Sequence, residues 1–168
     1  MRHVFIVNPV SGKADASGLL VPRIIQAAAQ QHLNYQILLT EKPGHGVELA
    51  QRQAQQEGQV RLYACGGDGT LNEVLRGAYG HANAQVACVP CGSGNDFVRN
   101  FGGSVPFLNL EDLIQGEAVP MDLIETDQGI AVAICSAGLD AQVAYGIPKF
   151  RRIPLCGGSM AYKLSILQ

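Results

Sequence analysis

The sequence predicts an α/β fold with a parallel sheet, followed by the beginning of an antiparallel, β-rich second domain. Apolar strand-like runs alternate with helix-like runs up to about Gly116, and this alternation is typical of parallel sheets covered by helices. Glycine-rich turns follow the third and fourth runs. After Gly116 the pattern changes to a hairpin signal. Because ligands of such sheets gather at the carboxyl ends of the strands, the glycine turns are the first place to look for a site.

Four runs predict the strands of the sheet. They begin at His3 and Tyr35, cover 61–65 with an end at Gly66, and cover 84–90. Each is short, apolar and closed by turn residues, as strands are.

Three helices are predicted between and after these strands. The first covers 17–31 with Ser17 as its cap, and the second covers about 46–57. The third follows the third strand, where Thr70 and Glu73 have the spacing of a capping box.

The region after Gly116 predicts a second domain. Two strand-like runs within 118–144 are joined at 126–129 by a hairpin turn. A loop-like segment from Gly146 and a helix from Met160 follow. Since two strands and a helix cannot enclose a core, we expect 1–116 to form a nucleotide-binding domain and 117–168 an incomplete start of a β-sandwich domain.

Composition narrows the function classes. The net charge of −2 over 168 residues gives no broad basic surface, which argues against nucleic acid as a partner. The apolar run from Val4 to Val7 is too short for a secretory signal, and the stretch 129–139 is shorter than a membrane span. We therefore expect a cytoplasmic protein.

The five cysteines are an odd number, so we expect reduced, packed thiols. Cys88 and Cys91 form a C-x-x-C, which leaves metal or redox use open beside packing at a strand end. A zinc site would need a second pair of ligands, and the other cysteines are isolated.

Two glycine turns carry the chemistry. Each follows an apolar strand and presents an aspartate, Asp68 in the first and Asp96 in the second. Glycine lets backbone N–H groups approach a phosphate closely, and a nearby carboxylate can hold Mg²⁺ directly or through water. The pair predicts a site for nucleotide phosphates.

Two common nucleotide motifs do not fit. NPVSGK, from Asn8, would need glycine at Val7 and Ser or Thr at Ala14 to be a Walker A loop. The turn from Gly66 has Asn72 in place of the last glycine of the dinucleotide fingerprint, which argues against a dehydrogenase.

The motifs together resemble a known family. NPVSGK, LLTEKPGHGVELA, CGGDGTLNEVL and PCGSGNDFVRNFG resemble, in order, the catalytic domain of diacylglycerol kinases and their bacterial lipid-kinase, sphingosine-kinase and ceramide-kinase relatives. MDLIETDQGIAVAICSAGLDAQVAYG is similar to the family's entry into its second domain. NAD kinases and phosphofructokinases carry similar glycine–aspartate turns, but they do not share this combination.

The resemblance implies a Rossmann-like domain that binds ATP with Mg²⁺ and transfers the γ-phosphate to a lipid hydroxyl. The nucleotide contacts that it implies are Asn8, Ser11, Gly12, Lys13, Thr40, Gly66, Gly67, Asp68, Gly69, Thr70, Leu71, Asn72 and Ser93. It places Asp68, Asp96 and Asp122 in an aspartate–water–Mg²⁺ network, the first two as metal contacts.

The family's general base lies later in the second domain than any residue up to Gln168. The resemblance therefore implies a fragment that transfers phosphate poorly alone. The acceptor stays open among diacylglycerol, sphingosine, phosphatidylglycerol and other alcohols, and the donor stays open between ATP and GTP.

Several alternatives remain at this stage. Asp96 could serve merely as a helix cap, Asp122 could be merely a solvated side chain, and Lys13 could be an ordinary charged residue of a loop. Lys149, Arg151 and Arg152 alternate with apolar residues, which fits either peripheral membrane contact or a solvated loop. The rival functions are an NAD kinase and a non-catalytic nucleotide-binding module completed by a partner or by homo-oligomerisation.

Overall fold

The computed structural model describes residues 1–12, 15–127, 129–151 and 165. The chain forms two compact units, Met1–Ala133 and Ile134–Gln168. Each is described by itself. None of the described helices is long and apolar enough to cross a membrane.

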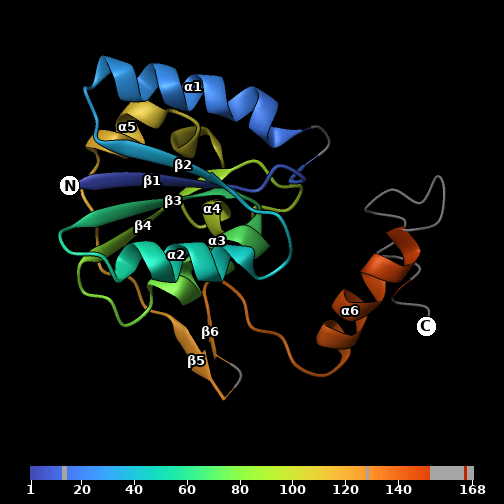
Figure 1. Ribbon diagram of the computed structural model, residues 1–168. Coiled ribbons are helices and arrows are strands. Elements are labelled where there is room, and N and C mark those ends of the chain that lie inside the picture. Colours follow the sequence, from blue (N-terminus) through green and yellow to red (C-terminus); the bar gives the residue numbers. More distant parts are fainter. Residues whose placement is uncertain (13–14, 128, 152–164, 166–168) are drawn as a thin grey trace. The chain divides into compact units, whose positions relative to one another are not determined.

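The first unit contains a parallel sheet with the strand order β2-β1-β3-β4 (Figure 1). Its strands are β1 (Arg2–Val7), β2 (Tyr35–Leu39), β3 (Val60–Gly66) and β4 (Ala84–Pro90), so the four predicted strands are confirmed. The chain runs from β1 to β2 on one side and then to β3 on the other. The strand order thus reverses between β1 and β3, and α/β sheets bind ligands at the carboxyl ends of the strands beside such a reversal.

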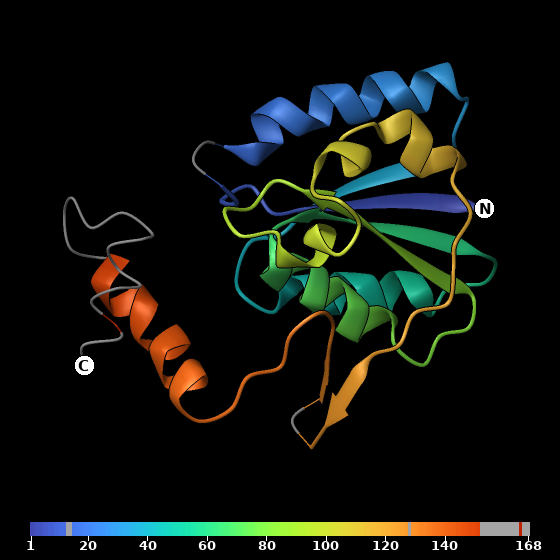
Figure 2. The same ribbon diagram turned by 180° about the vertical axis from the view of Figure 1, so that it is seen from behind.

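Helices cover both faces of the sheet. On one face lie α1 (Ala16–Gln30) and α5 (Leu110–Gln115); on the other lie α2 (His45–Ala54) and α3 (Asp68–Ala78) (Figures 1 and 2). A short helix, α4 (Asp96–Arg99), and a 3₁₀ turn at Val105–Phe107 follow β4. The predicted α/β class is therefore confirmed.

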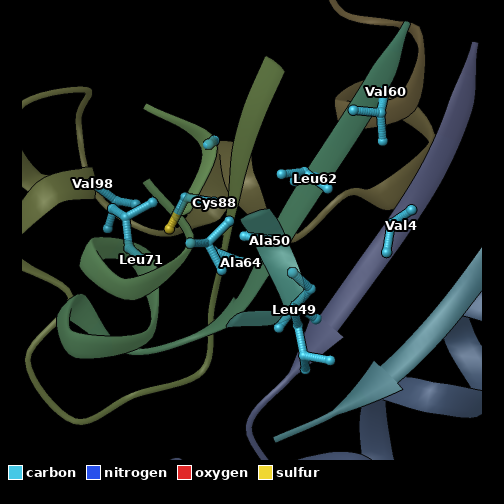
Figure 3. Packing of buried hydrophobic residues seen from close by; sticks show 12 residues of the cluster. Val4, Leu49, Ala50, Val60, Leu62, Ala64, Leu71, Cys88 and Val98 are labelled. Atoms are coloured by element: carbon cyan, nitrogen blue, oxygen red, sulfur yellow. The ribbon is translucent and has the colours of Figure 1, made fainter. Parts of the chain in front are cut away.

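The core divides into two layers because strand side chains alternate between faces. In β1, Val4 and Ile6 belong to the layer under α2 and α3, whereas Phe5 and Val7 belong to the layer under α1 and α5. Figure 3 shows the first layer, where Leu62 and Ala64 of β3 lie with residues of α2 and α3. Both layers anchor the strand ends from which the turns emerge.

The helix starts differ from the predicted ones. Asp15, not Ser17, caps α1, because its carboxylate accepts the Ser17 backbone N–H. Helix α3 begins at Asp68 with Gly67 as its N-cap, so Thr70 lies inside the helix and the predicted capping box is wrong. Helix α2 ends at Ala54, three residues before the predicted end.

The predicted hairpin is confirmed: β5 (Ile124–Thr126) pairs antiparallel with β6 (Gly129–Ala131). It belongs to the first unit. The prediction of a second, sandwich-like domain over 117–168 stays a prediction.

The second unit contains α6 (Leu139–Arg151). The loop predicted from Gly146 is therefore wrong up to Arg151, where the chain is still helical. Nearly all of the helix predicted from Met160 lies outside the described residues, as does Arg152 of the basic segment.

Candidate functional site

The turn after β1 is tied to β3 and to α3. The backbone N–H of Asn8 donates to the Cys65 carbonyl at 2.9 Å, and its side-chain Nδ2 donates to Oγ1 of Thr70 at 3.1 Å. Its Oδ1 accepts the N–H of Val10 at 3.2 Å, which closes the turn. Asn8 thus joins the carboxyl ends of β1 and β3.

The same turn also reaches the end of β4. Gly12 has a φ of +85°, and a Cβ there would lie 2.5 Å from the carbonyl oxygen of Cys91. Only glycine accepts this conformation and this closeness together. Ser11 is half-buried in this turn. Lys13 lies outside the described residues, so its predicted phosphate contact stays a prediction.

The turn after β3 leads directly into α3. Gly66 ends the strand and accepts the N–H of Cys91 at 2.9 Å, and Gly67 is the N-cap. The first N–H groups of a helix have no acceptor within the helix and form its positive end, which favours anions. The glycine turn therefore places the N-terminus of an 11-residue helix, which is suited to bind an anion, at the carboxyl end of the sheet.

The turn after β4 is closed by its own side chain. Asn95, at a φ of +55°, accepts the Gly92 N–H through Oδ1 at 3.1 Å and donates through Nδ2 to the Gly92 carbonyl at 2.8 Å. A Cβ at Gly92 would lie 3.0 Å from the backbone nitrogen of Gly67. The two glycine turns thus pack backbone against backbone. Ser93 is exposed on the second turn.

Asp68 lies between the two turns. Its Oδ1 accepts the N–H of Phe97 at 3.2 Å, and a Cβ at Gly94 would lie 2.9 Å from its Oδ2. The neighbouring Asp96 instead forms an ion pair of 2.9 Å with Arg99, in which Arg99 is largely and Asp96 partly exposed. Asp68 is the carboxylate that the structure places at the junction of the turns.

The other predicted residues are distributed around this junction. Thr40, at the end of β2, is tied to β1 by its N–H, which donates to the Val7 carbonyl at 2.9 Å. Asp122 is exposed in the segment between α5 and β5. Across the described residues, no three His, Cys, Asp or Glu side chains converge as a metal cluster would. The predicted meeting of Asp68, Asp96 and Asp122 therefore stays a prediction.

The cysteines near the turns are buried thiols. Burial raises the pKa of Cys88 to about 12, with the Asp68 carboxylate as a lesser cause. Burial also raises the pKa of Cys91 and of Cys65. Because the thiolate is the form that binds metals and reacts, these groups favour packing over metal or redox chemistry.

The junction fits a polyphosphate. Apart from the adjacent residues and the backbone of α3 itself, no described atom lies within 4 Å of the place where a Cβ at Gly69 would be, so the space beside the first turn of α3 is open. The Oδ1 of Asn72, one turn further on, is buried without a hydrogen-bond partner among the described residues. Mg²⁺ in phosphate sites is usually held by one or two carboxylates, water and the phosphates themselves. Asp68 is suited to that part.

A separate cavity of about 520 Å³ lies along β4. Apolar side chains such as Leu75, Phe101 and Phe107 line most of it, with Leu71 and Phe97 at the side of the turns. The turn glycines do not line it. An apolar cavity does not suit a phosphate, so we place the candidate site at the turns.

Sequence reasoning named one residue at this edge, Glu73, but assigned it to the wrong helix. Glu73 accepts the N–H of Gly44 through Oε1 and that of Gly46 through Oε2, both at 2.9 Å. The sequence predicted that Glu73 caps its own helix, α3, but its carboxylate binds the start of α2 instead. The signal was present: α2 begins after Gly44 and has no side chain at its N-cap to accept a hydrogen bond, so an acceptor had to come from elsewhere.

The chain was compared with known families and proteins. A family model described as the diacylglycerol kinase catalytic domain matches residues 2–126. A diacylglycerol kinase of Staphylococcus carnosus is 28% identical over 146 residues, which are 86% of this chain and 47% of that protein. One of Bacillus subtilis is 28% identical over 168 residues, which are 97% of this chain and 54% of that protein.

Solved structures agree. The crystal structure of a diacylglycerol kinase from Bacillus anthracis matches with a TM-score of 0.59 at 26% identity, over 77% of this chain and 47% of that one. The chain thus spans about half the length of the relatives that it matches.

Proposed function

Because this chain belongs to the diacylglycerol kinase catalytic domain family, we propose that it binds Mg·ATP and provides the nucleotide site for phosphate transfer to a lipid alcohol. One observation carries this proposal: the turns at Gly67 and Gly92 meet backbone to backbone at the start of α3, with the Asp68 carboxylate between them. Backbone donors, a helix start and a carboxylate are the parts that phosphoryl transfer needs for positioning and charge neutralisation.

The residues have separate parts in this proposal. The first N–H groups of α3 bind phosphate oxygens, and Asn8 fixes the hydroxyl of Thr70 at the same place. Asp68 anchors Mg²⁺ directly or through water, with Asp96 as a second contact and Asp122 in the surrounding network. The bound metal would supply neutralisation of the phosphate charge.

The acceptor is proposed from the family. The relatives are named for diacylglycerol, and the chain covers 47% of the length of the relative from Staphylococcus carnosus. We extend the proposal to a lipid alcohol in general, to peripheral contact with the membrane that contains it, and to self-association of the chain. Weak transfer by this chain alone stays a prediction.

The substitution Gly69→Ala tests the phosphate site. Outside its own helix turn, a Cβ at Gly69 meets no described atom, and alanine in place of glycine stabilises a helix by roughly 0.5–1 kcal/mol. We expect the thermal midpoint to hold or rise while Mg·ATP affinity, measured by calorimetry, falls at least tenfold, because the methyl group occupies the space of the phosphate. Unchanged Mg·ATP affinity in the folded variant would mean that the phosphate does not bind at this turn.

A transfer assay tests the reaction. The purified chain is incubated with γ-labelled ATP and diacylglycerol, sphingosine or NAD, and label is counted in each acceptor. Slow transfer to a lipid that Asp68→Asn abolishes supports the proposal. Transfer to NAD instead would make the chain an NAD kinase. Failure to bind any nucleotide at millimolar concentration would contradict the proposal altogether.

A further inference from the structure

We propose that Glu73 is a positioning residue that holds the loop between β2 and α2 as the nucleoside-facing wall of the site. This inference rests on the proposed function. It starts from the two hydrogen bonds of 2.9 Å by which the Glu73 carboxylate accepts the N–H groups of Gly44 and Gly46.

The contact acts as an N-cap supplied by another helix. Gly44 precedes α2, has a φ of +83° and has no side chain to accept a hydrogen bond. A carboxylate at this end satisfies N–H groups that the helix leaves without acceptors and interacts favourably with the positive end of the helix. Glu73 therefore fixes where α2 begins.

Helices α2 and α3 pack closely at two glycines. A Cβ at Gly46 would lie 2.7 Å from Oε2 and 3.0 Å from the Cβ of Glu73. A Cβ at Gly77, one turn along α3, would lie 2.7 Å from the Cβ of Ala50 and would collide with the carbonyl of Val47. The two glycines thus let α2 approach α3 closely enough for the carboxylate to reach both N–H groups.

The loop 40–44 is held at both ends. At one end the Thr40 N–H donates to the Val7 carbonyl of β1, and at the other Glu73 binds Gly44. Between them the N–H of Glu41 donates to Nδ1 of His45 at 3.1 Å. The loop therefore has a defined path beside the turn after β1, on the side away from β3.

One helix connects this loop to the phosphate site. Glu73 follows Asp68 by five residues, which is about 7.5 Å along the helix axis. The phosphates would bind at the start of α3, which follows β3. In the strand order, β1 lies next to β3 and β2 next to β1, so we place the nucleoside at the carboxyl ends of β1 and β2. Glu73 thus sets the loop at a fixed distance from the phosphates, which is what recognition of a whole nucleotide requires.

Two probes separate this role from a structural one. Inorganic tripolyphosphate with magnesium reaches only the phosphate positions, whereas Mg·ATP also reaches the loop. We expect Glu73→Gln to weaken ATP binding at least tenfold and to change tripolyphosphate binding less than twofold, as measured by calorimetry. Glutamine has only one acceptor oxygen, so it cannot accept one N–H at each of its two terminal atoms as the carboxylate does.

The matched control is Glu48→Gln. Glu48 lies in the first turn of α2, forms an exposed ion pair of 3.6 Å with Lys42, and loses the same charge when it is replaced by glutamine. We expect it to change neither affinity. Hydrogen exchange gives a readout without ligand: the amides of Gly44 and Gly46 should exchange faster in Glu73→Gln and not in Glu48→Gln.

Three outcomes would overturn the inference. Equal weakening of both probes would mean that Glu73 only stabilises the fold, and unchanged affinities would mean that the loop does not meet the nucleoside. Unchanged hydrogen exchange at both glycines would mean that Glu73 does not hold the N–H groups of Gly44 and Gly46. If the unsubstituted chain binds neither probe, the proposed function fails first, so the two failures are distinguishable.

Discussion

Polar groups at the two ends of the first unit's sheet are used in opposite ways. Near the amino end, the buried side chains of His3 and Tyr63 share a hydrogen bond of 2.8 Å. There the buried guanidinium of Arg61 donates at 2.9–3.0 Å to Gln85 and to the Leu113 and Ile114 carbonyls. At the carboxyl end, the polar groups are the backbone of glycine turns and a partly exposed Asp68.

The two ends differ in whether the polar groups find their hydrogen-bond partners within the protein or leave them to a ligand. Near the amino end, the buried side chains of His3, Tyr63 and Arg61 form their hydrogen bonds within the protein, as most buried polar groups do. At the carboxyl end, Asn8, Asn95 and Asp68 shape the turns but leave the first N–H groups of α3 directed outward. A closed network serves stability, whereas an open set of donors serves a ligand, and the predictions below separate these two functions.

The largest effect is expected from Gly92→Ala. Its Cβ would press on the backbone of Gly67, which cannot rotate away as a side chain could. Overpacking of this kind costs about 3 kcal/mol, and separation of the turns should abolish ATP binding. Urea unfolding and nucleotide titration measure the two effects. A variant with normal stability and binding would show that the turns do not need this contact.

Arg61→Met should have the opposite balance. It removes the donor for three acceptors in a buried place, so we expect a loss of about 2 kcal/mol in the free energy of unfolding. Mg·ATP affinity of the folded variant should remain unchanged because the residue is remote from the turns. Loss of Mg·ATP affinity without loss of stability would contradict the assignment of stability to the amino end and of ligand binding to the carboxyl end.

Tyr63→Phe is a smaller change in the same network. Burial raises the pKa of the Tyr63 hydroxyl to about 12, so it keeps its proton, and it shares a hydrogen bond of 2.8 Å with Nδ1 of His3. Loss of this hydrogen bond should cost about 1 kcal/mol, while the ring stacking on Phe5 remains. Chemical denaturation measures it, and a stabilised variant would show that the hydrogen bond is absent in solution.

The smallest effect concerns pH. Burial, helped by the Arg61 charge, lowers the pKa of His3 below 6.5. The unfolded chain therefore binds a proton more readily, and stability should fall as the pH drops below 6.5. The effect of His3 is the difference between the unsubstituted chain and His3→Gln, followed by denaturation from pH 7.5 to 5. Parallel curves for the two proteins would contradict it.

The strands and their turns could be predicted because the signals are local. The β1 and β3 runs alternate between the two core layers, and glycines mark the strand ends where the chain turns back. The details that failed depend on contacts across the chain. Glu73 has the local spacing of a cap for its own helix but binds Gly44, 29 residues away in sequence.

Local composition was also misleading in the second unit. Gly146 and Pro148 are typical of a loop, yet both lie within α6. The position of Asp122 relative to Asp68 could not be derived either, since a hairpin signal fixes the pairing of β5 with β6 and not their place beside the sheet.

The most direct test is an amide NMR titration of the chain with Mg·ATP. The account predicts the largest shift changes at Gly67, Gly69 and Gly92, around the start of α3, and almost none at the amide of Arg61. Changes centred on the amino end of the sheet, or none at millimolar nucleotide, would contradict the assignment of the glycine turns as the phosphate site.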